Sequence, residues 1–102
     1  MSESSQPSSA EHQASFSALV YSLSASALAA MGHELPGIPK QEKNLTLARH
    51  SISLLEMLKT KTEGNRTPQE TSLLEDLLCQ LRLAFVAAEK TDAAEKRQER
   101  AT

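Results

Sequence analysis

The sequence predicts an all-α protein with a three-helix unit, in which helices two and three form an antiparallel hairpin. Two observations lead to this prediction. Apolar residues recur at intervals of three and four residues in three separate segments, which is the spacing of one face of a helix. Helix stop and start signals also lie between these segments. The spare apolar faces described below further predict that the unit assembles into an oligomeric bundle.

The first predicted helix covers residues 16–31 and carries no charge. The chain as a whole is 24% charged, yet no charged residue occurs from Phe16 to Gly32. Ser15 can cap the free amides of the first turn, and Gly32 can take the left-handed conformation that closes a helix. Serines are the polar residues of this helix. Their hydroxyls can donate a hydrogen bond to a carbonyl one turn earlier, so they tolerate burial. We therefore expect it to be buried on more than one side, with another helix close by.

This charge-free run is too short to cross a membrane, and it lacks the features of an export signal. Sixteen residues of helix span roughly 24 Å, whereas a bilayer core needs about 30 Å. No Lys or Arg precedes Lys40, so the positive segment that begins a signal peptide is missing. The single cysteine, Cys79, excludes an internal disulfide and agrees with a reducing compartment. We therefore expect a cytoplasmic protein that does not insert into a membrane.

The second predicted helix covers residues 45–63 and follows a loop of restricted backbone. The loop, residues 33–43, contains two prolines and a glycine. Asn44 can cap the helix and Gly64 can stop it. Two neighbouring apolar stripes together cover about half of the helix circumference. A helix with that much apolar surface is expected to pack against two neighbours.

The clearest local signal in the chain is the turn that joins helices two and three. Thr67 is placed as the N-cap and Pro68 as the first helical residue. Glu70 stands three residues after the cap, which completes a capping box. Only Asn65 and one further residue separate this cap from the stop at Gly64. The two helices must therefore fold back on each other.

The third helix, expected over residues 68–90, carries one broad and one narrow apolar face. Cys79, Leu83 and Val86 form the narrow one, roughly opposite the broad one. Seven apolar residues share the broad face at helical spacing: Leu74, Leu77, Leu78, Leu81, Ala84, Phe85 and Ala88.

The two ends of the chain are not expected to join the domain. Residues 1–14 are rich in serine and are expected to be disordered. Residues 91–102 are rich in charge and are expected to fray or to be disordered. One helical domain remains over residues 15–90, a size at which a lone core is marginal.

Such a unit can bury one apolar stripe per helix but cannot easily cover two. The surplus faces predict a homo-oligomer, with a dimer favoured. Helix one is the expected interface, through residues on both of its sides: Phe16, Leu19, Val20, Tyr21, Leu23, Ala25 and Leu28.

Two runs of sequence, NLTLARHSISLLEML at residues 44–58 and KTEGNRT at residues 61–67, carry a resemblance to a known family. Over about residues 16–86 the chain resembles the small bacterial family called domain of unknown function 1844. The resemblance implies a compact bacterial helical protein with no assigned activity. Two positions depart from the family pattern, because Ser53 stands where an Asp is usual and Arg66 where a Leu is usual.

No residue pattern in the chain indicates a catalytic, cofactor or metal site. His12, His33 and His50 each lack a second His or Cys three or four residues away, the spacing that places two ligands on one helix face. His50 and Cys79 could supply a base and a nucleophile, but no third group is evident to orient the base. We therefore predict no catalytic residue, no cofactor and no metal ligand.

Arg82 has two interpretations. It flanks the broad apolar face of helix three, so its guanidinium can reach a carboxylate on a neighbouring helix, such as that of Glu56. Alternatively, it could anchor an anion or a ligand. The ion pair, which would hold the register of two helices, is the favoured interpretation.

The charge distribution argues against a nucleic-acid partner. Residues 40–66 carry six basic and three acidic groups, a modest excess, and only Phe16, Tyr21 and Phe85 could stack on bases. We predict a non-enzymatic, self-associating interaction or accessory module, and the sequence identifies no further protein partner. The alternative is a small-molecule binder or enzyme with a pocket formed between subunits.

Overall fold

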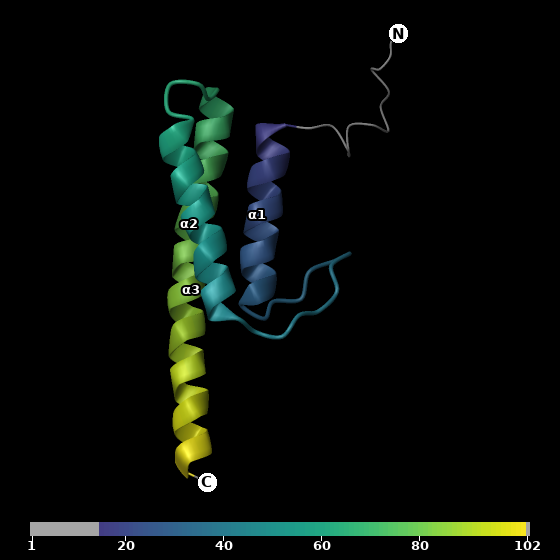
Figure 1. Cartoon of the computed structure of the whole chain (residues 1–102), viewed down its shortest axis with the longest axis vertical. Coiled ribbons are helices and arrows are strands. Elements are labelled where there is room, and N and C mark those ends of the chain that lie inside the picture. The colour runs from purple at the N-terminus through teal and green to yellow at the C-terminus, as the bar shows by residue number, and fades with distance from the viewer. Residues whose placement is uncertain (1–14, 102) are drawn as a thin grey trace.

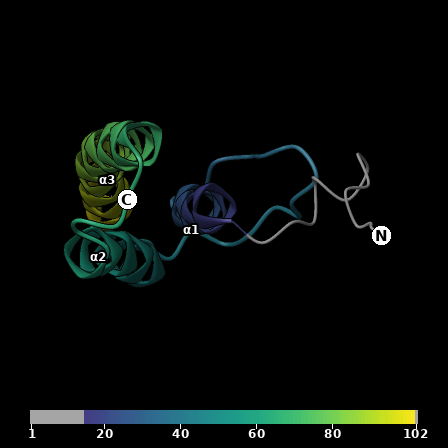
Figure 2. The ribbon, with the colours of Figure 1, turned by 90° about the horizontal axis from the view of Figure 1, so that it is seen from above.

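The computed structural model describes residues 15–101, which form three packed helices. α1 covers Phe16–Ala30, α2 covers Leu45–Lys61 and α3 covers Pro68–Ala101. α1 and α3 run in one direction and α2 runs in the other (Figure 1). Seen along their length, the helices stand at the corners of a triangle (Figure 2). The predicted all-α class and the antiparallel pairing of the second and third helices are confirmed.

The described residues contain no strand, only an isolated backbone bridge between Leu35 and Ile38 in the loop after α1. The expected disorder of residues 1–14 concerns a segment outside the described residues.

The hydrophobic core lies between the three helices and uses one face of each. Its largest fully buried side chains are Leu55, Leu74, Leu78, Leu81 and Val20. The three from α3 belong to the broad apolar face predicted for the third helix. The remaining members of the cluster are Ala27, Ala30, Met31, Ala48 and Ile52. The partly buried residues packed around it include Phe16, Leu23, Leu77 and Phe85.

Small buried residues line the facing sides of α1 and α2. Ala27 and Ala48, one from each helix, are fully buried in the same core cluster. Ser24 and Ser51 are also buried, and the Ser24 hydroxyl donates to the Val20 carbonyl at 2.8 Å. This bond satisfies the hydroxyl inside its own helix, as predicted for the serines of this segment. Small side chains and a satisfied hydroxyl allow a charge-free helix to lie close to α2.

Side-chain caps begin α1 and α2 where the sequence predicts them. The Ser15 hydroxyl accepts from the Ala18 amide at 3.0 Å, and the Asn44 side-chain oxygen accepts from the Leu47 amide at 3.0 Å. Each bond satisfies an amide that has no partner within the helix. The Asn44 amide donates to the Ala30 carbonyl at 2.7 Å. This backbone bond ties the start of α2 to the end of α1 and closes the loop between them.

The observed helix ends differ from the predicted ones at three places. α1 ends at Ala30, with Met31 as its C-cap, and α2 ends at Lys61, two residues before the predicted end. α3 continues to Ala101, although the sequence predicts an end near Lys90.

The extension of α3 has both a local and a long-range contribution. Residues 91–101 contain mainly Ala, Glu, Lys, Arg and Gln, which favour helix, and no Gly or Pro. Asp92 pairs with Lys96 one turn later at 3.2 Å, a spacing that stabilises helices. Lys43, from the loop before α2, reaches Glu95 at 3.2 Å and Asp92 at 3.9 Å. A segment of high charge, which predicts an unstructured tail, is therefore compatible with a helix here, because its residues favour helix and Asp92, Glu95 and Lys96 are paired.

The close packing of α1 on α2 can be tested by enlarging a buried small residue. Ala48→Leu should lower the free energy of unfolding by about 1–3 kcal/mol, because the added carbons must enter a fully buried position in the core. Ser53→Leu makes a comparable change at an exposed position of the same helix and should alter stability by no more than about 0.5 kcal/mol. Urea unfolding followed by circular dichroism measures both variants. Equal effects of the two substitutions would contradict this description of the interface.

Candidate functional site

The turn between α2 and α3 has the predicted capping box. The Glu70 amide donates to the Thr67 hydroxyl at 3.1 Å, and the Thr67 amide donates to a Glu70 carboxylate oxygen at 2.9 Å. Pro68 is the first residue of α3, where its missing amide costs no hydrogen bond. Gly64 has a φ of +84°, a left-handed conformation that favours glycine. The Asn65 amide donates to the Thr62 carbonyl at 2.9 Å and closes the turn.

Arg66 is the residue of this turn whose role the sequence does not reveal. Its Nη1 donates to the Lys59 carbonyl at 2.6 Å and to the Thr62 hydroxyl at 3.0 Å. Its Nε donates to the Thr71 hydroxyl at 3.0 Å. The side chain thus satisfies a carbonyl of the last turn of α2 and links that turn to the first turn of α3. The sequence shows an arginine at this position, but it does not show that the guanidinium reaches a carbonyl of α2.

Arg82 forms the ion pair that is its favoured interpretation. Its Nη2 and Nε donate to one carboxylate oxygen of Glu56, at 2.8 and 3.2 Å. Both side chains are about half exposed, so the pair contributes at most about 1 kcal/mol. Its second predicted role, as an anchor for an anion, remains a prediction.

Two more ion pairs join the same sides of α2 and α3. Lys59 pairs with Glu75 at 3.7 Å, and Arg49 pairs with Glu89 at 3.3 Å. The Arg49 guanidinium also lies over the Phe85 ring, 5.3 Å from its centre. The three partners on α3 are spaced seven residues apart, two helical turns, so they follow one edge of the helix. From Glu75 to Glu89 this edge faces α2.

The residues predicted as an interface on the first helix do not form one exposed face. Val20 is fully buried and belongs to the core of a single protomer, so its assignment to an exposed interface is wrong. Phe16, Leu23 and Leu28 are partly buried against the same core. Ala25 is likewise of intermediate exposure. The core of the protomer thus uses one apolar side of α1, which includes Val20, Leu23 and Ala27.

Leu19 and Tyr21 are the large apolar residues that α1 exposes, at 45% and 57%. They are two residues apart and therefore point about 200° apart around the helix axis. They cannot belong to the same flat contact.

α2 and α3 also expose large apolar residues. Leu47 and Met57 are 43% and 45% exposed on α2, and Leu83 and Val86 are 69% and 47% exposed on α3. Cys79 is exposed as well, on the same side of α3 as Leu83 and Val86. The second apolar patch that the sequence predicts on the third helix is therefore present, and it faces solvent in the protomer.

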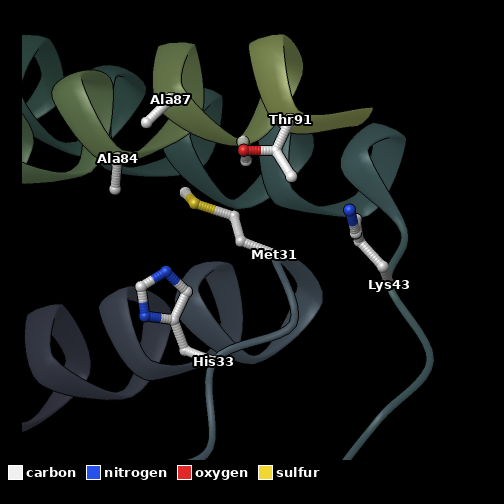
Figure 3. Close-up of a pocket in the computed structure, with 7 residues that line it drawn as sticks. Met31, His33, Lys43, Ala84, Ala87 and Thr91 are labelled. Atoms are coloured by element: carbon white, nitrogen blue, oxygen red, sulfur yellow. The ribbon is translucent and has the colours of Figure 1, made fainter. Parts of the chain in front are cut away.

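An open pocket lies between the end of α1 and the middle of α3 (Figure 3). Its volume is about 250 Å³, and Met31 reaches from the end of α1 toward the alanines of α3. The residues that line it are Met31, His33, Lys43, Ala84, Ala87, Ala88 and Thr91. Lys43 is already paired with the acidic side chains of α3. The pocket therefore offers a shallow apolar surface with one imidazole and one hydroxyl.

Metal-binding geometry and membrane-spanning length are both absent from residues 15–101. No group of three His, Cys, Asp or Glu side chains in this range could hold a metal ion. None of the three helices is long and apolar enough to cross a bilayer.

Arg66 and Arg82 are expected to contribute unequally to the stability of the hairpin, and the difference can be measured. Arg66→Ala should lower the free energy of unfolding by about 1–2 kcal/mol, because it leaves a carbonyl of α2 without its donor and unlinks the turn. Arg82→Ala removes an exposed pair and should cost at most about 1 kcal/mol. Chemical unfolding of both variants gives the comparison, and a larger loss for Arg82→Ala would contradict these roles.

Comparison with known proteins gives one match. No curated protein and no solved structure matches the chain. The model of the family described as Domain of unknown function (DUF1844) matches residues 13–87. This range contains α1, α2, the capping-box turn and the first part of α3. Since the match covers well over half of the 102 residues, the chain belongs to the DUF1844 family.

Proposed function

We propose that this protein is a self-associating helical module that serves protein–protein interaction and carries no enzymatic activity of its own. The observation that supports the proposal best is the exposure of large apolar side chains on every helix. Six are exposed among residues 15–101: Leu19, Tyr21, Leu47, Met57, Leu83 and Val86.

The size of the unit strengthens this argument. Single exposed apolar residues are normal on a protein surface. Leu83 and Val86, however, stand with Cys79 on one side of α3, so the exposure there is contiguous. A contiguous apolar patch on a small domain is a common mark of a protein interface. A small core also gains from association, because a partner covers apolar surface that the chain cannot cover alone.

The ionisable groups of the protein support a non-enzymatic role. Lys43, which lines the pocket, is already engaged in ion pairs with Asp92 and Glu95. His33 stands beside Met31 and a row of alanines, and no carboxylate or cysteine is among the residues that line the pocket. A small-molecule binder is the second candidate function, and this pocket is the feature of the protomer that favours it. A cytoplasmic location, which the single Cys79 favours, is part of the proposal.

The proposal predicts the mass of the protein in solution. Light scattering after size-exclusion chromatography should give at least twice the 11.1 kDa of one chain at micromolar concentration. The apparent mass should fall on dilution, because the exposed patches are small. A monomer over the whole range that also fails to bind a dye for exposed apolar surface would contradict the proposal.

A further inference from the structure

We propose that two copies of this chain pair in antiparallel orientation through the outward face of α3. The inference rests on the proposed function, because it names the surface by which the module self-associates. The occupant of the surface is a second copy of the same chain.

Three sides of α3 have different environments. Leu74, Leu78 and Leu81 are buried in the core. Glu75, Arg82 and Glu89, which recur every seven residues, pair with side chains of α2. The remaining side faces away from both neighbouring helices, since α3 occupies a corner of the three-helix arrangement (Figure 2). We call this side the outward face of α3.

The outward face has the spacing of a helix-pairing seam. Leu83 and Val86 are its exposed apolar centre. Six residues lie along it: Asp76, Cys79, Leu83, Val86, Lys90 and Arg97. The first five are separated by alternating steps of three and four residues, and the last follows after seven. Such a seven-residue repeat is typical of helices that pair along their length. All six are exposed. From the first to the last, the seam extends over roughly 32 Å of helix.

The charges of this seam differ between its two ends. Asp76 lies on the N-terminal side of the apolar centre, while Lys90 and Arg97 lie on its C-terminal side. Two parallel copies would place each of these charges against its own counterpart, which is unfavourable. Two antiparallel copies centred between Leu83 and Val86 place Asp76 of one copy beside the segment from Lys90 to Arg97 of the other. Charge therefore selects the antiparallel arrangement, and the two-fold axis makes both ends equivalent.

These three charges are also available for a partner. Every charged residue on the edge of α3 that faces α2 is paired at 3.7 Å or less. In contrast, Asp76, Lys90 and Arg97 form no ion pair with any residue in the range 15–101. A second copy of α3 supplies opposite charges to all of them.

The composition of the N-terminal segment argues against that segment as the occupant. Residues 1–14 contain no aliphatic side chain larger than alanine apart from Met1. They cannot cover Leu83 and Val86 with comparable apolar surface. A second α3 brings the same leucine and valine to the contact, so the apolar centres cover each other.

The apolar centre can be tested with a charged substitution and a matched control. Leu83→Glu should weaken self-association at least about 100-fold, because it places two carboxylates near the two-fold axis. Leu19→Glu is the control, since it makes the same change at an exposed residue of α1 and should leave association unchanged. Sedimentation over a range of concentrations measures the constants, and circular dichroism confirms that both variants remain helical.

The outcomes separate the two proposals. A monomeric wild-type protein would overturn the proposed function and this inference together. If the wild-type protein self-associates and the Leu83→Glu variant still does so, the α3 interface is overturned and the proposed function stands. The same holds if only Leu19→Glu abolishes association. Association that needs a different protein, with the wild-type chain monomeric alone, would also overturn the inference.

Charge reversal tests the orientation without changing the apolar centre. Asp76→Lys should weaken association about tenfold at low salt, because the new lysine meets Lys90 and Arg97 of the partner. Adding Lys90→Glu to the same chain should restore most of the loss, because the introduced lysine of one copy would then lie near the introduced glutamate of the other. A parallel pair would keep its like charges opposite each other in both variants. Failure of the second substitution to rescue the first would therefore overturn the antiparallel arrangement.

Discussion

The close contact between α1 and α2 is the constraint on which the rest of the structure depends. α1 has no charged residue with which to interact with water, so its main apolar stripe must be covered. Ala27 and Ala48 allow the two helices to meet, and the bond from the Asn44 amide to the Ala30 carbonyl joins their ends. α3 then closes the third side of the core with its leucines. This arrangement uses the inner side of α3 and leaves the outer side uncovered.

Much of the fold can be predicted because its signals are local. The caps at Ser15, Asn44 and Thr67 and the glycine stops each depend on neighbouring residues, and the apolar spacing identifies the buried face of each helix. The continuation of α3 could not be predicted from composition alone. Besides the helix-favouring residues of the segment itself, it has the contact of Lys43, which lies far away in sequence and meets Asp92 and Glu95 only in the folded chain.

The candidate site is less predictable for the same reason. The ion pair of Arg82 with Glu56 can be anticipated because a long side chain beside a core stripe has few partners to choose from. The hydrogen bonds of Arg66 depend on how a turn brings two helix ends together. The prediction for Val20 is wrong because helical spacing tells which residues share a face, and it does not tell which face a neighbour covers. The second patch on α3 is visible in the sequence, but its exposure depends on where α1 lies.

The uneven distribution of charge over the helices means that salt and temperature act on different parts of the molecule. The edge between α2 and α3 is bridged by exposed ion pairs, which dissolved ions screen. The contact between α1 and α2 contains no such pair among residues 15–101, so ionic strength has little direct effect on its stability. Its strength follows the hydrophobic effect, which weakens on cooling. Salt therefore acts chiefly on the pairs along this edge, while cooling weakens the apolar core that all three helices share.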